Sequence, residues 1–290
     1  MGITKAVIPA AGFGTRFLPA TKAVPKPLVT VVDTPTIQYI VAEAVEAGLT
    51  DILIVTSANT RAIADHFDRS WELEAFLRER GKDDLADQMR AIAEMADIHY
   101  VDQHEPRGLG HAVSLAERHV GDEPFAVLLS DNIMDRPLLQ PMIKAFDEYG
   151  RSVVALQEVA RDQVPNYGIA EVEGVGGRLV KVLDIVEKPP VEEAPSNLAA
   201  IGRYVFMPGI FEALARTEPG WGGEIQLTDA IRSLAPAQAV FGYLYEGKLY
   251  DVGRKPDYLQ ATVELAAKDP VLGEEFKRFV ADFAARHKLV

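Results

Sequence analysis

Residues 5–16 have the sequence KAVIPAAGFGTR, in which an apolar run leads directly into small residues and an arginine. The run Lys5–Ala11 predicts a buried strand. Gly12 and Gly14 then allow backbone N–H groups to approach a phosphate or a flat base, because no Cβ stands in the way. Two familiar nucleotide motifs are excluded. A dinucleotide fingerprint needs a third glycine where Phe17 stands, and a P-loop needs Gly-Lys-Ser/Thr.

Strand and helix patterns alternate after this loop. Apolar, β-branched runs predict strands, and helical spacing of apolar residues predicts helices. The predicted strands are Asp51–Val55, Ile98–Val101 and Phe125–Leu129, and the predicted helices are Pro35–Gly48, Thr60–Phe67 and Gly110–His119. Such alternation implies βαβ crossovers. We therefore expect an α/β, Rossmann-like fold whose mixed, mostly parallel central sheet is covered by helices.

Three segments depart from this alternation. Trp71–Ala96 is charged and helical with a break near Gly81, which predicts an inserted surface helix pair. Beyond residue 151, hairpin signals predict an additional small β region, with strands at Ile169–Val172 and Leu179–Val186. Near the C-terminus an apolar stripe at helical spacing predicts a helix that docks on its own core or on another subunit. The stripe consists of Leu272, Phe276, Phe279, Val280 and Phe283.

Composition limits the classes of protein. The 290 residues are 48% hydrophobic and 25% charged, enough for one large core rather than a disordered chain. The chain has no cysteine, which excludes disulfides, thiolate nucleophiles and cysteine-ligated zinc and fits a reducing cytoplasm. The sequence contains no apolar run of 18 residues, so no membrane span is predicted. The net charge of −13 argues against broad contact with nucleic acid, since an acidic surface repels phosphate backbones.

The N-terminal stretch is a local exception to this acidity. The first carboxylate is Asp33, whereas an even distribution would place roughly five before it. Lys5, Arg16, Lys22 and Lys26 are therefore unopposed there. One explanation is a buried strand and loop without room for charge. The other is an anion site, in which the Arg16 guanidinium and the Lys26 ammonium hold a triphosphate over the loop.

Ala10–Arg16, followed by Pro25-Lys26-Pro27-Leu28, resembles the signature of the sugar-1-phosphate nucleotidylyltransferases. Further motifs of that family recur in order, and the resemblance covers nearly the whole chain. They are Thr36–Val41, Gly108–Ala112, Asn166–Gly168, Glu187–Pro189 and Gly223–Asp229. Two positions depart from the family pattern: Thr34 replaces a residue that is basic in many relatives, and Ser130-Asp131-Asn132 is not the commonest sequence around the metal carboxylate.

The resemblance implies a nucleotidyltransferase fold and Mg²⁺-assisted transfer of a uridylyl group from UTP to glucose 1-phosphate. It also implies a cytoplasmic homo-oligomer, a dimer or a tetramer. We expect one domain over residues 1–290. Residues 1–150 would form the nucleotide-binding half with its insert at 71–96, residues 151–255 the sugar-phosphate-binding half, and residues 256–290 the C-terminal helices.

Two carboxylates are candidate metal ligands. Asp131 follows the predicted strand Phe125–Leu129 at its carboxyl end, where ligands of open α/β sheets bind. Asp251, which lies between Tyr250 and Gly253, would supply the second carboxylate, since Mg²⁺ is typically held by one or two carboxylates plus phosphate oxygens. Asp135 is an alternative to Asp131. An aspartate at the end of a strand is otherwise only a turn or cap residue.

The resemblance assigns the remaining site residues. The loop residues Ala10, Ala11, Gly12, Gly14 and Thr15 would bind the nucleotide. Gln103 and the Gly108 backbone would bind the base edge, and a carboxamide can donate and accept there at once.

The acceptor residues come from the second half of the chain. Glu187 would accept hydrogen bonds from sugar hydroxyls, Lys188 would pair with the sugar phosphate, and Gly168 would approach the sugar closely. Pro189 predicts an extended Lys188. Taken alone, a Glu-Lys pair is more often a solvated surface feature.

The sequence shows no catalytic triad, no GxSxG elbow and no HExxH motif. None is needed for this reaction, because a sugar phosphate is already largely dianionic at neutral pH and attacks without a general base. Arg16, Lys26 and Lys188 would instead position and neutralise the phosphates. Alternatives remain: dTTP, ATP or GTP as the donor, a non-catalytic regulatory subunit that binds nucleotide sugars, and a nicotinamide-dependent dehydrogenase.

Overall fold

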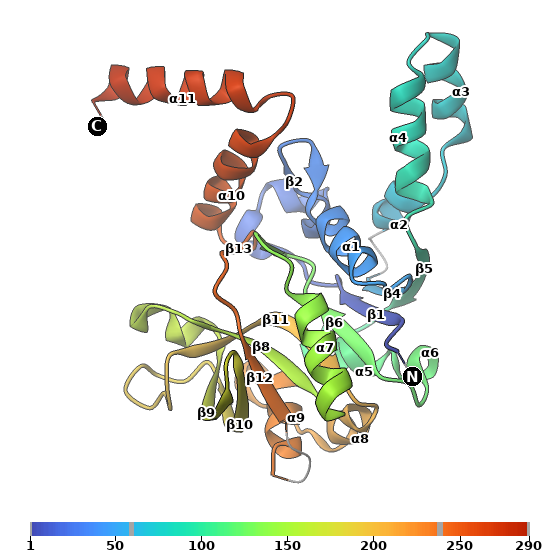
Figure 1. The fold of residues 1–290 in the computed structure, drawn as a ribbon. Coiled ribbons are helices and arrows are strands. Elements are labelled where there is room, and N and C mark those ends of the chain that lie inside the picture. Colours follow the sequence, from blue (N-terminus) through green and yellow to red (C-terminus); the bar gives the residue numbers. More distant parts are fainter. Residues whose placement is uncertain (1, 58–60, 237–239, 289–290) are drawn as a thin grey trace.

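The computed structural model describes residues 2–57, 61–236 and 240–288 (Figure 1). The strands are β1 (Lys5–Pro9), β2 (Thr30–Val31), β3 (Thr34–Pro35), β4 (Asp51–Thr56), β5 (Asp97–Asp102), β6 (Phe125–Leu128), β7 (Asn132–Met134), β8 (Val153–Glu158), β9 (Gly168–Gly176), β10 (Leu179–Glu187), β11 (Leu198–Phe206), β12 (Val240–Leu244) and β13 (Leu249–Asp251).

The α-helices are α1 (Thr36–Glu46), α2 (Arg61–Phe67), α3 (Trp71–Glu79), α4 (Asp83–Ala93), α5 (Leu109–Ser114), α6 (Glu117–Val120), α7 (Leu139–Tyr149), α8 (Gly209–Arg216), α9 (Leu227–Leu234), α10 (Lys255–Lys268) and α11 (Gly273–His287). Short 3₁₀ turns lie at Thr15–Phe17, Ala20–Lys22, Lys26–Leu28, Arg161–Asn166 and Trp221–Gly223.

Nine strands form one sheet in the order β5-β4-β1-β6-β11-β8-β12-β10-β9. The pairings β5–β4, β4–β1, β1–β6 and β12–β8 are parallel. The four remaining neighbouring pairings are antiparallel, because β11 runs against both of its neighbours and β10 against β12 and β9. The predicted α/β fold is confirmed. The parallel character is strongest in the first half of the chain, where βαβ crossovers connect the strands, and the sheet as a whole is more evenly mixed than the sequence indicates.

Two apolar cores lie on opposite faces of this sheet. Along β1 the side chains alternate, so that Ala6 and Ile8 enter one core and Val7 enters the other. Helices α1 and α7 contribute to the first core, and α5, α8 and α9 to the second. Because both faces are covered, the central strands are apolar on both sides. This rigid frame positions the loops that follow β1 and β6.

The predicted insert is a hairpin of two helices, α3 and α4, that projects from the body (Figure 1). The chain reverses between them at Gly81, which has φ +66. Helix α2 begins, as described, at Arg61, and the predicted start at Thr60 lies outside the described residues. The helix predicted at Gly110–His119 is divided into α5 and α6.

The last helix, α11, extends away from the body beyond α10 (Figure 1). Its apolar stripe is largely exposed, with Leu272, Phe279, Val280 and Phe283 all uncovered and Phe279 54% exposed. The alternative that this stripe docks on its own core is therefore wrong. Within the described residues, no helix combines the length and the apolar character that a membrane crossing requires.

Candidate active site

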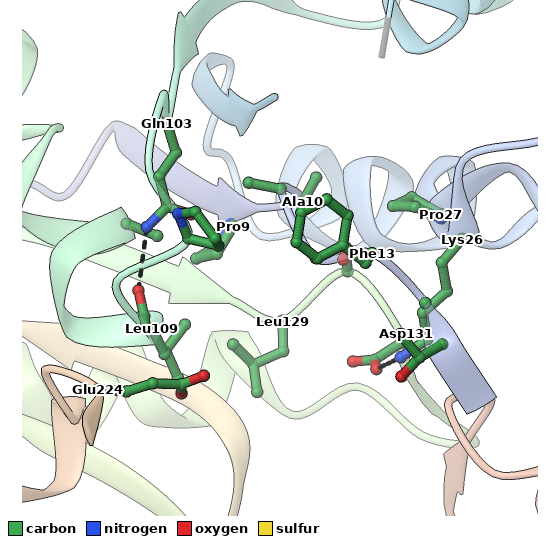
Figure 2. A pocket seen from close by; sticks show the side chains of 18 residues that line it. Pro9, Ala10, Phe13, Lys26, Pro27, Gln103, Leu109, Leu129, Asp131 and Glu224 are labelled. Carbon is green, nitrogen blue, oxygen red and sulfur yellow. Dashed lines mark hydrogen bonds and ion pairs between the residues drawn. The ribbon is translucent and has the colours of Figure 1, made fainter. Parts of the chain in front are cut away.

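The loops after β1 and β6 enclose a cavity of about 380 Å³ at the carboxyl ends of these strands. Among the predicted site residues its wall contains Ala10, Ala11, Gly12, Gly14, Thr15, Lys26, Gln103, Gly108 and Asp131. Figure 2 shows Gln103 at one end of the cavity and Lys26 with Asp131 at the other. Arg16, Gly168, Glu187, Lys188 and Asp251 lie outside this wall. A long, two-ended cavity suits a ligand with a base at one end and phosphates at the other.

The loop after β1 packs closely against residues 21–26. Gly14 has φ +63, a conformation that favours glycine, and a Cβ there would lie 2.8 Å from Lys26 Cβ. The Thr21 hydroxyl donates a 2.8 Å hydrogen bond to the Gly14 carbonyl. Gly14 therefore lets the loop pack directly against the segment that carries Lys26.

Gln103 is almost fully buried at the base end of the cavity. Its side-chain nitrogen donates to the Gly108 carbonyl at 3.1 Å and lies 2.9 Å from His111 Nδ1. Burial, followed by the charge of Arg107, lowers the pKa of His111, so the ring accepts this hydrogen bond in its neutral form. Both contacts use the side-chain nitrogen, so the carboxamide oxygen keeps its capacity to accept a hydrogen bond.

Gly108 brings a distant segment against the base end. Its φ is +103, and a Cβ would lie 2.7 Å from both Glu224 Cβ and the Ile225 carbonyl oxygen. Backbone hydrogen bonds fasten the same approach, from Gly110 N to Ile225 O and from Ile225 N to Arg107 O, both at 2.8 Å. Two of the motifs in the sequence, around Gly108 and Gly223–Asp229, therefore form one wall.

The two predicted metal carboxylates lie side by side. β7 and β13 pair so that Asn132 faces Asp251, and Val252 N donates to Asp131 O at 2.9 Å. A Cβ at Gly253 would lie 2.8 Å from an oxygen of each carboxylate. Asp131 also forms an ion pair with Lys26. Gly253, which the sequence did not single out, therefore leaves the space in which the two carboxylates and Lys26 converge.

The surroundings of Asp251 raise the pKa of its carboxyl group. Burial and then the nearby charge of Asp131 raise its pKa to about 6, and Lys26, the Gly253 N–H and Arg16 oppose this rise. Arg16 is exposed on the rim, within electrostatic range of the pair. Two adjacent carboxylates of which one is desolvated are a donor set of hard oxygens that fits a divalent cation.

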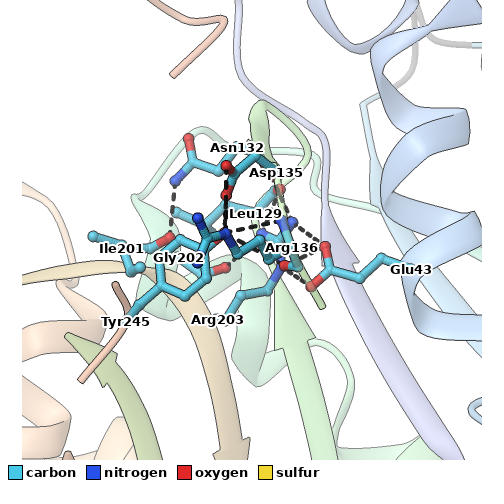
Figure 3. Close-up of polar contacts among 9 residues, drawn as sticks. All are labelled: Glu43, Leu129, Asn132, Asp135, Arg136, Ile201, Gly202, Arg203 and Tyr245. Atoms are coloured by element: carbon cyan, nitrogen blue, oxygen red, sulfur yellow. Dashed lines mark hydrogen bonds and ion pairs between the residues drawn. The ribbon is translucent and has the colours of Figure 1, made fainter. Parts of the chain in front are cut away.

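A buried ion pair supports the loop that carries Asp131 (Figure 3). Arg203 is fully buried and binds the Glu43 carboxylate through Nε and Nη2, with distances of 2.7–3.1 Å. The same guanidinium donates to Asn132 O at 2.5 Å and to Gly202 O at 3.0 Å. None of the sequence motifs includes Arg203. Its only signal was an arginine within the otherwise apolar run of Leu198–Phe206.

The predicted acceptor residues form a second cluster. The Thr228 hydroxyl donates to Glu187 Oε2 at 2.6 Å, and a Cβ at Gly168 would lie 2.9 Å from that hydroxyl. Lys188 Nζ lies 3.3 Å from Glu187 Oε1 and 3.9 Å from the centre of the Trp221 ring. The prediction of an extended Lys188 is wrong: its φ is +46, in the left-handed region, and its N–H donates to Tyr167 O at 3.0 Å, one residue beyond the paired strands β9 and β10.

Tyr167 connects the acceptor cluster to the carboxylate pair. Its pKa is raised first by burial and then by the charge of Asp251, while Arg254 opposes the rise. Its carbonyl is the one that holds Lys188 N. Tyr167 therefore lies within electrostatic range of Asp251 and bonds through its backbone to Lys188. Asp135, the alternative ligand, instead accepts hydrogen bonds from Tyr245 OH at 2.9 Å and Lys248 N at 2.6 Å.

Comparison with known proteins assigns the family. Residues 5–268 match the model of the nucleotidyl transferase family. The chain belongs to this family. As a nucleotidyltransferase it is 51% identical, over 280 residues, to UTP–glucose-1-phosphate uridylyltransferase 2 of Staphylococcus saprophyticus, a match that covers 96% of this chain and 97% of that protein. The family resemblance inferred from the motifs is confirmed, and the dehydrogenase alternative is removed.

Solved structures of the same family confirm the fold. A UDP-glucose pyrophosphorylase complexed with UDP-glucose aligns with a TM-score of 0.85 and 42% identity, over 92% of this chain and all of that one. A UTP-bound UGPase from Acinetobacter baumannii aligns with a TM-score of 0.89 and 41% identity, over 96% of this chain and 99% of that one. The predicted nucleotidyltransferase fold therefore holds over nearly the full length.

Proposed function

We propose that the protein transfers a uridylyl group from UTP to glucose 1-phosphate, giving UDP-glucose and pyrophosphate. The observation that carries this proposal is the continuity of the site. One cavity wall contains both Gln103 and Asp131, Asp131 converges with Asp251 at Gly253, and Tyr167 lies within electrostatic range of Asp251 while its carbonyl binds Lys188 N. The names of its relatives in the family support the same activity.

The protein's own residues position two anions for in-line displacement. Gln103 and the backbone of Gly108 hold the base, and the loop of Gly12 and Gly14 holds the phosphates. Lys188 aligns the sugar phosphate so that one of its oxygens bonds to the α-phosphorus, and the bond to the pyrophosphate oxygen then breaks. Arg16 and Lys26 neutralise the departing pyrophosphate.

Asp131 and Asp251 would hold the divalent cation, and we propose Mg²⁺. Oxygen ligands from one or two carboxylates plus phosphates are its usual protein environment. The bound ion would supply additional neutralisation of the phosphates. Since Lys26 is paired with Asp131 in this structure, the ammonium already lies next to the region where nucleotide phosphates would be held.

A pyrophosphate-release assay with glucose 1-phosphate and each of UTP, dTTP, ATP, GTP and CTP tests the donor. We expect a clear preference for UTP, and a preference for another nucleotide would overturn the assigned donor. Asp131→Asn and Lys188→Ala should each lower turnover about a hundredfold or more with the fold retained. A purified variant with near-normal turnover would refute its assigned role. Absence of all turnover in the wild type would favour a regulatory subunit.

We propose that the protein is a homo-oligomer in which α11 pairs with α11 of a second copy. The apolar stripe is exposed, Glu274 and Glu275 open the helix, and Arg286 and His287 end it. An antiparallel pair would place the acidic start of one helix beside the basic end of the other. Phe276, Phe279 and Phe283 form a continuous ladder of rings for this contact.

Sedimentation velocity tests this assembly. Phe279→Glu with Phe283→Glu should dissociate the oligomer, and Ala281→Glu, on the opposite face, should not. A wild-type monomer, or a double variant that assembles unchanged, would contradict the pairing. We also propose a cytoplasmic location and a single domain over residues 1–290, with nucleotide-binding (1–150), sugar-phosphate-binding (151–255) and C-terminal helical (256–290) parts.

A further inference from the structure

Two histidines and one aspartate converge near the amino ends of strands β4 and β5, opposite the end of the sheet that carries the cavity. Asp51 is the first residue of β4, His99 is the third residue of β5, and His119 belongs to α6. The nucleotide cavity lies at the other, carboxyl ends of the strands. Five residue steps along β4 separate the two edges by about 17 Å. This cluster is therefore separate from the proposed active site.

The three side chains share one small volume. His119 Nε2 lies 2.7 Å from Asp51 Oδ1, and His99 Nε2 lies 3.8 Å from the same oxygen. One ligand atom from each residue lies within 4.8 Å of the others, the only such group of three among the described residues. The two imidazole rings are 4.8 Å apart and inclined by 52°. Both rings therefore turn a nitrogen toward one carboxylate oxygen.

This geometry is close to that of a transition-metal site. In tetrahedral Zn²⁺ sites with bonds of 2.0–2.1 Å, ligand atoms are roughly 3.3 Å apart. The two separations from Asp51 Oδ1, 2.7 and 3.8 Å, lie on either side of that value, and all three ligand atoms lie within 4.8 Å of one another, so side-chain shifts of roughly 1 to 1.5 Å would admit an ion. His99 is the more exposed partner, which leaves a solvent-facing position for a water ligand.

The ammonium of Lys5, one neighbouring cation, is engaged by other oxygens. Lys5 is the strand neighbour of Asp51, and its ammonium binds the carbonyls of His119 and Val120 at 3.2–3.3 Å and Glu123 at 2.6 Å. On the other side, the strand neighbour of Asp51 is Asp97, a second acidic residue. The local charge around the histidines therefore favours a divalent cation.

We propose that Asp51, His99 and His119 bind one divalent transition-metal ion of the Zn²⁺ class. Imidazole nitrogens select such ions over Mg²⁺, which prefers oxygen. The ion would fasten α6 to β4 and β5. It would thereby restrain both ends of the segment 99–119, which carries Gln103 and Gly108. The inference stands independently of the proposed transferase reaction, since it concerns a different edge of the sheet.

Calorimetric titration of the full chain with ZnCl₂ tests the site. The protein is prepared without a polyhistidine tag, stripped with EDTA, and kept in excess MgCl₂ so that the Asp131–Asp251 pair is occupied. We expect one Zn²⁺ per chain and a melting temperature that rises by roughly 5 °C at a hundredfold excess over Kd. Wild type without saturable binding under these conditions would overturn the proposal.

His99→Ala is the decisive variant, because it leaves the His119–Asp51 hydrogen bond in place. Loss of an outer partner of a metal ligand already costs 10–100-fold in affinity, so loss of His99 itself should cost about a hundredfold or more. The metal-free variant should melt like the wild type. His287→Ala, which removes an exposed histidine elsewhere, should bind Zn²⁺ normally. Equal affinity of His99→Ala and wild type would refute the site.

Discussion

Replacing Arg203 by methionine tests how the protein holds the loop that carries Asp131. Methionine preserves most of the side-chain volume but removes the guanidinium, which is fully buried. Four acceptors are affected (Figure 3): the Glu43 carboxylate loses its partner, the Asn132 carbonyl loses its donor, the Gly202 carbonyl keeps only the Leu129 N–H, and the Leu129 carbonyl loses a long contact of 3.4 Å. Asn132 follows Asp131 directly. The variant should therefore affect both the stability of the protein and the geometry of the carboxylate pair.

The expected loss of stability can be worked from these contacts. Removing one partner of a buried ion pair costs about 3–5 kcal/mol, and an orphaned buried carbonyl about 1–3 kcal/mol. The Glu43 side chain retains 16% exposure, so water still solvates part of the unpaired carboxylate and the lower end of each range applies. We expect a total of about 4 kcal/mol, which corresponds to a fall in melting temperature of roughly 10 °C.

Urea denaturation followed by circular dichroism measures this loss, and Mg²⁺ titration of the activity measures the geometry. Arg232→Met is the matched control, because it breaks the exposed Arg232–Asp184 pair and should cost no more than about 1 kcal/mol. The concentration of Mg²⁺ for half-maximal activity should rise in Arg203→Met and stay constant in the control. An Arg203→Met protein as stable as the control, with unchanged Mg²⁺ dependence, would show the reasoning to be wrong.

Three further outcomes are expected. Since the pKa of Asp251 is raised to about 6, Mg²⁺ affinity should fall about tenfold per unit of pH below that value, and Asp251→Asn should remove this dependence in a Mg²⁺ titration between pH 5 and 8. The raised pKa of Asp251 also means that, in the metal-free protein, its contribution to stability is full below pH 4 and is lost as the pH rises through 6. The melting temperature of the metal-free wild type should therefore fall over that interval by more than that of Asp251→Asn. Gly108→Ala should raise KM for the nucleotide at least about tenfold, because the added Cβ would lie 2.7 Å from Ile225 O at positive φ; an unchanged KM would contradict the close approach.

The parts of the site that follow from the sequence are those encoded locally. The loop after β1 was predictable because a strand, two glycines and a cation are consecutive in the chain. Asp131 was predictable because it stands two residues after the apolar strand predicted at Phe125–Leu129. Gly253 and Thr228 could not be assigned in the same way, since their roles arise from contacts with Lys26 and Glu187 across the fold. The positive φ of Lys188 could not be predicted either, because the proline that follows it favours an extended conformation.

The burial of Arg203 explains why stability and function are coupled at this site. A buried guanidinium is tolerated only when its donors are satisfied, and here they are satisfied by Glu43 of α1 and by the backbone on either side of Asp131. Helix α1, the loop that carries Asp131 and β11 must therefore be in their native positions together. A sequence pattern shows only an arginine within an apolar strand, which is an apparent conflict with burial. The fold resolves this conflict by placing the Glu43 carboxylate beside the guanidinium of Arg203. The remaining donors of Arg203 bind backbone carbonyls on either side of Asp131, so the buried arginine supports that loop.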